Sequence, residues 1–262
     1  MNLKKSARQA TRSEGRPSNR EYPHGVDVKV DSFIAETLTP VIHEIAEGDL
    51  DGVFAFCGRE RIGKSTLTLA LDVWESRLIA KLTGREPWEV FALSHVAQTP
   101  DKYSELNDNM PLKSVLHYDE GGTGMYNRRA MSKSNVGLNQ MLMTCGANNH
   151  VHNVCMQSFA ALDPDVRYRR ILGVFNVFAH VDERGGMPKL VRGFADYYSG
   201  EDIGRIRVDQ ETRLTIWPKP RYPTIRFGDF PACPFFAAYK EESRLAKRVV
   251  GRGVSESLRA KP

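Results

Sequence analysis

The sequence lacks the long apolar runs that are typical of membrane proteins and secreted precursors. It has no uninterrupted apolar stretch near the roughly 18 residues that a transmembrane helix needs, so we expect no membrane span. Residues 1–25 contain no apolar core of the kind found in a secretory signal. The sequence therefore predicts a protein that is made and used in the cytoplasm.

Cysteine is also scarce, and its spacing argues against a zinc site. The four cysteines occur singly, with no CxxC pair. Cys57 and Cys155 fall inside apolar runs, where a reduced and buried thiol is expected. His150 and His152 share one face of a predicted strand, but no carboxylate is near them in sequence, so this pair does not indicate a metal site.

The excess of basic over acidic side chains is confined to the two ends of the chain. Residues 1–25 carry six basic and two acidic side chains, and residues 239–262 carry seven basic and three acidic ones. Because the net charge of the whole chain is +5, the middle is slightly acidic. Two interpretations stay open: the ends are simply solvated, or they contact nucleic acid phosphates or an acidic partner.

Alternating strand and helix patterns predict an α/β fold with a mainly parallel sheet. We expect a disordered basic arm over residues 1–25, a core over 26–198, and an irregular Pro-rich segment with a basic helix over 199–262. The predicted strands are 52–57, 90–93, 115–118, 151–158 and 171–181, with a hairpin return at 189–197. The predicted helices are a pair or a broken helix around Pro40 in 29–47, then one directly after residue 65, then 95–106, 132–145 and 235–249.

Residues 58–65 match the phosphate-binding loop pattern GxxxxGK[ST]. The match lies between an apolar strand and an amphipathic helix, which is where such a loop works. The glycines let backbone N–H groups surround phosphates, Lys64 reaches the β- and γ-phosphates, and Ser65 holds Mg²⁺. The predicted ATP-binding residues are Gly58, Arg59, Glu60, Arg61, Ile62, Gly63, Lys64, Ser65 and Thr66.

Three polar residues at strand ends complete a predicted hydrolytic site. Asp119 ends a buried strand, which suits support of the Mg²⁺ ion, and Glu120 is placed to activate the attacking water. Gln157 ends the next strand and is a candidate sensor of the γ-phosphate, although polar strand ends are common. With Lys64, we predict Glu120 and Gln157 as catalytic residues.

Arginine is abundant near these motifs, and any of several groups could supply an arginine finger. A surface salt bridge is the simpler interpretation for each one. The candidates are Arg59 and Arg61 within the loop, Arg128 and Arg129 after the Asp-Glu pair, and Arg167, Arg169 and Arg170 after the fourth strand.

In this order of motifs the chain resembles the FtsK/HerA superfamily of DNA-pumping ATPases. Its length is most similar to the genome-packaging ATPases of tailless icosahedral DNA viruses, and it also resembles the zonular occludens toxin family. The similarity spans about residues 50–198 and rests on the phosphate loop, Asp119-Glu120, Gln157 and the segment 163–167.

The resemblance implies a RecA-like P-loop ATPase that uses ATP and Mg²⁺ to move double-stranded DNA. It implies a homo-oligomeric ring, a pentamer or hexamer, and a capsid-vertex or portal-like partner. It further implies Mg²⁺ held by Ser65 and Asp119, and a location in host cytoplasm or at a packaging vertex of the virion. The chain departs from the family at Gly121-Gly122 and Arg128-Arg129, so the arginine that acts in trans is not assigned.

Three other interpretations remain open. One is an ATPase that drives phage or virion assembly, although its toxin-like relatives usually carry a membrane helix. Another is a terminase-type ATPase without a nuclease, since the segment after Tyr197 is short and has no acidic cluster. A small-substrate kinase is disfavoured because Glu120 directly after Asp119 suits water activation.

Overall fold

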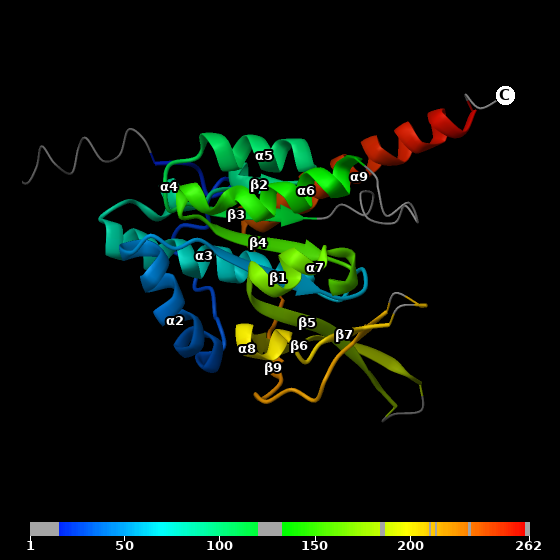
Figure 1. Cartoon of the computed structure of the whole chain (residues 1–262). Helices are drawn as coiled ribbons and strands as arrows, with labels where there is room; N and C mark the ends of the chain where they lie inside the picture. Colours follow the sequence, from blue (N-terminus) through cyan, green and yellow to red (C-terminus); the bar gives the residue numbers. More distant parts are fainter. Residues whose placement is uncertain are drawn as a thin grey trace, which may run out of the picture.

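A seven-stranded, mostly parallel sheet forms the centre of the molecule. The computed structural model describes residues 16–119, 133–183, 187–209, 211–212, 214–229 and 232–259. The sheet order is β2-β3-β4-β1-β5-β6-β9, and the first five strands in this order are parallel (Figure 1). The α/β prediction is confirmed, and the architecture is consistent with a RecA-like fold. The strands are β1 (Gly52–Cys57), β2 (Val96–Ala97), β3 (Val115–Asp119), β4 (Val151–Met156), β5 (Ile171–Asp182), β6 (Lys189–Ser199) and β9 (Ile225–Arg226), and β7 (Arg207–Val208) pairs with β8 (Thr215–Ile216).

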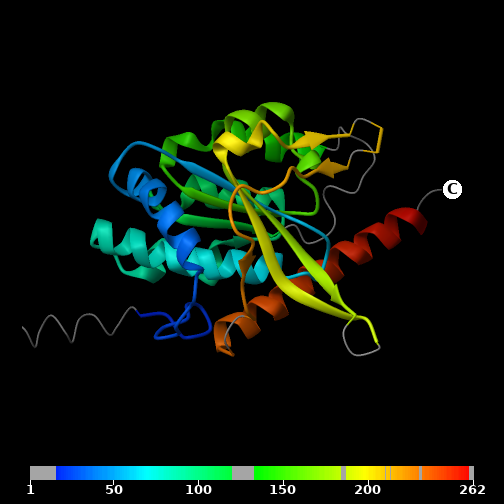
Figure 2. The same ribbon diagram turned by 90° about the horizontal axis from the view of Figure 1, so that it is seen from below.

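Helices cover both faces of this sheet (Figure 2). One face carries α2 (Ser32–Glu47), α3 (Lys64–Thr83) and α9 (Pro234–Arg259). The other carries α5 (Pro100–Asn109), α6 (Lys133–Thr144), α7 (Pro164–Arg169) and α8 (Gly200–Ile203). Strand β1 is apolar throughout because Phe54 and Phe56 pack into the first core while Val53, Ala55 and Cys57 pack into the second.

The strand register brings the carboxyl ends of β1, β3 and β4 to one edge of the sheet. Cys57 at the end of β1 is level with Met156 of β4, and Asp119 at the end of β3 is level with Cys155 of β4. Since these strands are parallel, their last residues lie at the same edge. The predicted site residues at the three strand ends are therefore neighbours in space.

Several predicted elements are wrong in type or extent. Residues 90–93 do not form a strand: Pro87 and a capping box of Glu86 and Glu89 favour the helical turn α4 (Pro87–Val90), η1 (Leu93–His95) follows, and the strand is β2. The predicted break at Pro40 is absent, because α2 continues through it with Ile34, Leu38 and Ile42 buried along one side. The helix expected at 95–106 begins at Pro100, where Thr99 is the N-cap.

Of the two terminal segments, the described residues 16–25 and the segment 199–235 pack on the core or pair with the sheet. Tyr22, in the predicted disordered arm, is only 2% exposed and its hydroxyl lies 3.2 Å from the Ser76 hydroxyl. The segment 199–235 contributes β9 to the main sheet, and α9 is longer than the predicted 235–249. The short 3-10 helices η2 (Cys145–Asn148) and η3 (Phe159–Ala161) flank β4.

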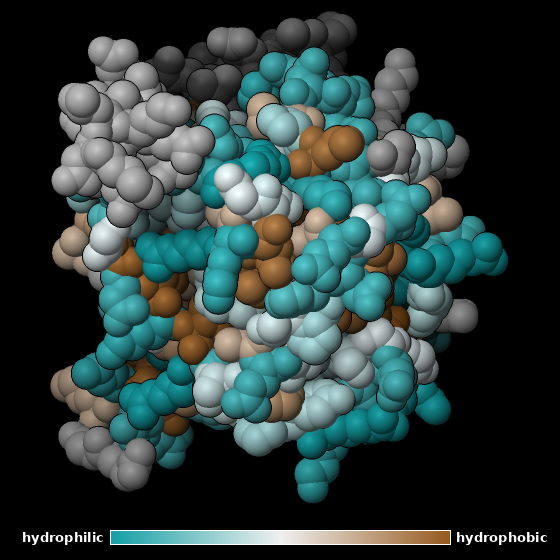
Figure 3. Space-filling view, turned by 90° about the vertical axis from the view of Figure 1, so that its left-hand side faces the viewer, coloured by the Kyte–Doolittle hydropathy of each residue, from teal (hydrophilic) through white to brown (hydrophobic). Residues whose placement is uncertain are grey.

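The face of the molecule at the amino ends of the parallel strands is mainly hydrophilic. Its hydrophobic residues form small patches separated by polar ones (Figure 3). Among the described residues, no helix combines the length and apolar character needed to cross a bilayer.

Candidate functional site

The 58–65 loop joins β1 to α3 through backbone conformations that require glycine. Gly58 has φ +146°, and a Cβ there would lie 2.3 Å from the Val177 carbonyl oxygen of β5. Gly63 has φ +106° and is the N-cap of α3. Arg61 also has positive φ, 61°, which is uncommon for a residue with a side chain. The loop therefore follows a tightly bent path that places the amino end of α3 at the edge of the sheet.

Lys64 lies across the mouth of this loop. Its ammonium donates hydrogen bonds to the carbonyl oxygens of Gly58, at 2.7 Å, and Arg59, at 2.8 Å. The next residue, Ser65, donates from its hydroxyl to Oδ1 of Asp119 at 3.2 Å. A cation, a free helix N-terminus and a hydroxyl–carboxylate pair thus converge at one point, and together they favour an anion accompanied by a metal ion.

The second oxygen of Asp119 receives donors that the sequence did not indicate. The Tyr239 hydroxyl of α9 donates to Oδ2, and the Ser243 hydroxyl lies 3.5 Å from the same atom. Gln98 Nε2 is also 3.5 Å away. Burial and the nearby Asp119 charge raise the pKa of Tyr239, so its hydroxyl remains a donor. No local pattern could reveal these contacts, because 120 residues of chain separate Tyr239 from Asp119.

Gln157 also points toward the loop. Its Nε2 donates to Oε1 of Glu60 at 3.2 Å, which links the end of β4 to the 58–65 loop. The structure therefore places Ser65 of α3 against Asp119 at the end of β3, and Gln157 after β4 against Glu60 of the loop that leads to Lys64. Glu120, Arg128 and Arg129 lie outside the described residues.

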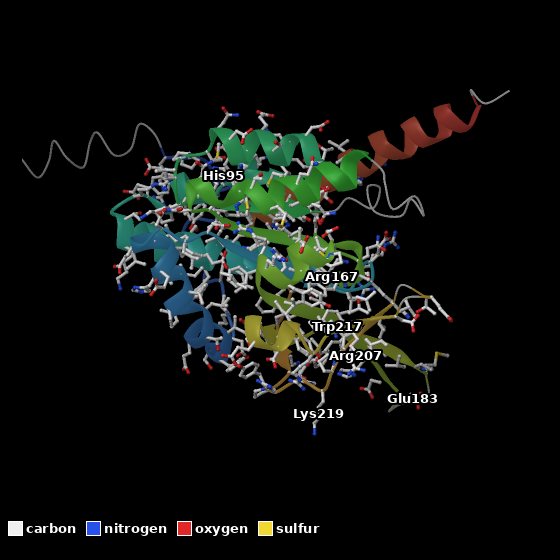
Figure 4. The ribbon with its side chains drawn as sticks, viewed as in Figure 1. His95, Arg167, Glu183, Arg207, Trp217 and Lys219 are labelled. Carbon is white, nitrogen blue, oxygen red and sulfur yellow. The ribbon has the colours of Figure 1, made fainter. Side chains whose placement is uncertain are left out.

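The described arginine candidates occupy different environments. Arg59 and Arg61 are exposed on the loop, and Arg169 pairs with Asp165 at 3.2 Å. Arg167 is 7% exposed, and its guanidinium lies 5.6 Å from the centre of the Tyr168 ring, on the α7 side of the sheet (Figure 4).

Arg170 lies far from the loop within this chain. It forms an ion pair with Asp51, which precedes β1, whereas the loop follows the other end of that strand. Asp51 also belongs to a group with Cys145 and His152 whose potential ligand atoms lie within 4.8 Å of one another. Burial raises the pKa of Cys145 to about 11 and Arg170 already neutralises Asp51, so this group is a poor cation site.

A second polar cluster is buried beneath α3. Nδ1 of His117 lies 2.6 Å from Oδ2 of Asp72, and Asn153 donates to Asp72 at 2.8 Å and to Glu75 at 2.6 Å. The Asp72 charge raises the pKa of His117 against the opposing effect of burial. Burial, with the neighbouring Asp72, raises the pKa of Glu75 to about 8. This cluster links α3 to β3 and β4 directly below the loop.

Comparisons of the chain with protein-family models, with curated proteins and with solved structures found no match.

Proposed function

We propose that this protein is a Mg²⁺-dependent ATPase whose hydrolysis of ATP drives the movement of double-stranded DNA, as in the packaging of a viral genome into a capsid. The observation that carries the ATPase part is the convergence of Lys64, Ser65 and Asp119 at the carboxyl edge of the sheet. Loops between a buried parallel strand and a helix N-terminus are well suited to phosphate binding.

The residues at this edge suit the parts of a triphosphate. Lys64 exchanges its two carbonyl partners for phosphate oxygens, and the backbone N–H groups at the start of α3 add further donors. The Ser65 hydroxyl and the Asp119 carboxylate supply the hard oxygen ligands that Mg²⁺ prefers. A bound Mg²⁺ ion would neutralise charge that develops on the phosphate oxygens.

The proposed hydrolytic step needs a base and a sensor. Glu120, directly after β3, accepts a proton from the attacking water. Gln157 leaves Glu60 and turns its amide toward the γ-phosphate or that water. An arginine from a neighbouring copy in a homo-oligomeric ring would complete the site, and the candidates for it are Arg128, Arg129, Arg167 and Arg170.

The DNA part of the proposal rests on charge and on the resemblance to DNA-pumping ATPases. Helix α9 carries Tyr239 at its buried end and continues through exposed Arg244 and Arg248. Basic side chains on an extended helix favour binding to a phosphate backbone, and such binding weakens as salt rises. Because Tyr239 of the same helix contacts Asp119, binding of DNA to α9 would act directly on the position of that carboxylate.

The test is phosphate release by the purified chain with ATP and Mg²⁺, with and without double-stranded DNA at low salt. We expect hydrolysis that DNA stimulates. Lys64→Ala should reduce ATP binding and turnover about a hundredfold or more, because it removes the only lysine of the loop. Lys81→Ala is the matched control, since Lys81 lies exposed in the last turn of the same helix.

Glu120→Gln separates binding from chemistry. We expect it to retain ATP binding and lose turnover. Equal hydrolysis by wild type and Lys64→Ala would refute the ATPase assignment. Hydrolysis that does not respond to DNA at any concentration would refute the coupling to DNA while leaving the ATPase intact.

A further inference from the structure

A cavity lies beside the amino end of α3, directly next to the 58–65 loop. Its volume is about 270 Å³. Apolar side chains form its floor, and they come from the segment before α2, from α2, from α3 and from β9 and the residues after it. They are Val28, Ile34, Leu67, Ala70, Ile225 and Phe227. The surrounding rim is polar and includes Asp27, Lys29 and Asp229.

Phe227 holds the cavity against the loop. A Cβ at Gly63 would lie 3.1 Å from Cε2 of the Phe227 ring, so the ring is in close contact with the loop backbone. The backbone N–H of Phe227 donates to the Gly193 carbonyl of β6 at 2.8 Å. Gly193 has φ +91°, and a Cβ there would lie 2.3 Å from the Phe227 carbonyl oxygen. The aromatic ring is thus fixed in place by the sheet.

The cavity and the proposed phosphate site share one helix turn. Thr66, which lines the cavity, is the second residue after Lys64, and Ala70 lies one turn further along α3. Because α3 rises only about 1.5 Å per residue, the distance from Lys64 to the cavity is within the length of one nucleotide. A triphosphate held by the loop could therefore place its other end in the cavity.

The rim carboxylates are available to a ligand. Among the described residues, the side chains of Asp27 and Asp229 make no hydrogen bond or ion pair, and both residues are exposed. Asp31, by contrast, accepts from the Phe33 N–H at 3.0 Å as the N-cap of α2. Carboxylates accept hydrogen bonds only, so Asp27 and Asp229 favour amino and hydroxyl donors.

We infer that this cavity binds the purine base and ribose of the nucleoside triphosphate whose phosphates occupy the 58–65 loop. The inference rests on the proposed function. The flat base packs on Phe227 and on the aliphatic floor, and the rim carboxylates accept from its amino group or from the ribose hydroxyls. A volume just below the usual range for ligand pockets suits a nucleoside alone and leaves the phosphates outside, on the loop.

The experiment compares two ligands that share the phosphate part only. Binding of ATP and of inorganic tripolyphosphate, each with Mg²⁺, is measured by calorimetry for wild type, Phe227→Ala and Lys64→Ala. We expect Phe227→Ala to weaken ATP binding about tenfold, since one base-stacking contact is lost, and to leave tripolyphosphate binding unchanged. Lys64→Ala weakens the binding of both ligands.

Two further variants keep the test independent of folding. Asp229→Ala changes an exposed side chain and should weaken ATP binding severalfold with no change for tripolyphosphate. Trp88→Ala is the control for loss of a half-buried aromatic ring, since Trp88 packs against Tyr22 and does not line the cavity. Wild type should also bind ATP more tightly than CTP, because a purine covers more of the apolar floor.

The outcomes separate this inference from the proposed function. Equal effects of Phe227→Ala on ATP and tripolyphosphate, or no effect on either, would overturn the base site while Lys64→Ala still reports on the phosphate site. Binding of CTP as tight as that of ATP would also count against it. If wild type bound neither ligand, both the phosphate site and the base site would fail.

Discussion

Two polar clusters lie on the same face of the sheet, and they are built in opposite ways. In the cluster around Asp119, the hydroxyls of Ser65 and Tyr239 donate to one carboxylate, and no cationic side chain pairs with it among the described residues. In the cluster around Asp72, the carboxylate is paired with His117 and is fully buried. The Asp119 carboxylate is next to the loop and its potential ligand oxygen lies within 4.8 Å of a His117 ring nitrogen without forming an ion pair, whereas the Asp72 carboxylate is paired directly with His117.

This difference indicates that the Asp119 cluster can bind a ligand, whereas the Asp72 cluster supports the position of α3. A carboxylate that is held by hydroxyl donors keeps its charge available for a metal ion, which suits chemistry at the loop. A carboxylate neutralised by a buried imidazole contributes to the position of α3 relative to β3 and β4 and offers nothing to a ligand. Substitutions in the two clusters should therefore affect different measurements.

The largest expected effect is on stability, from Asp72→Ala. Removing Asp72 takes away the charge that keeps the proton on buried His117 and leaves the ring and the Asn153 amide without their acceptor, and breaking a buried pair in this way costs about 3–5 kcal/mol. Urea denaturation should show the midpoint shifting to a much lower concentration. Asp72→Asn is the control: it keeps an acceptor for His117, so its loss should be smaller. A midpoint equal to that of wild type for Asp72→Ala would show that the pair is not a support.

The second effect is a pH dependence that comes from Glu75. Its pKa is raised from 4.5 to about 8, so the folded chain keeps a proton that the unfolded chain releases. Stability is therefore highest below about pH 4.5, falls as the pH rises toward 8, and then levels off for this group. The slope is at most about 1.4 kcal/mol per pH unit. The raised pKa of His117 acts in the same direction, with its contribution lost at still higher pH.

The Glu75 contribution is isolated by Glu75→Gln. The amide cannot ionise and can still accept from Asn153, so the free energy of unfolding should fall less steeply between pH 5 and 8. Denaturation of both proteins at four pH values in this range would measure the two slopes. Parallel slopes for the two proteins would mean that Glu75 does not hold the proton.

The sequence predicts the site residues that lie at strand ends, and it misses those that lie far along the chain. Lys64, Ser65 and Asp119 could be placed because the motif and the parallel topology bring strand ends to one edge. Tyr239 could not, because its role depends on how α9 folds back across α3 and β3, which is a matter of tertiary packing. The same holds for Phe227, whose position is determined by β6 and β9.

The wrong predictions of helix and strand position have a similar cause. The apolar residues 90–93 suit a strand by composition, but the capping groups around Pro87 give a helical turn instead. Pro40 suits a helix break by its missing N–H, but burial of Ile34, Leu38 and Ile42 on the core outweighs that loss. Local propensity predicted the sheet well where strands are long and buried, and it failed where two or three capping or packing contacts decided the outcome.

The smallest expected effect tests whether α9 belongs to the Asp119 cluster in a functional sense. Tyr239→Phe removes the hydroxyl that donates to Oδ2 of Asp119 and keeps the ring that packs near His117. If this donor orients the carboxylate, the Mg²⁺ concentration for half-maximal hydrolysis should rise about three- to tenfold, which corresponds to the loss of one ordinary hydrogen bond of about 1 kcal/mol. Stability should change little, and ATP binding in the presence of EDTA should not change.

Ser243→Ala is the matched control on the same helix, and its effect should be smaller because its hydroxyl lies 3.5 Å from the same oxygen. A lower Mg²⁺ requirement in Tyr239→Phe would reverse the interpretation, since it would mean that the hydroxyl competes with the metal for Asp119.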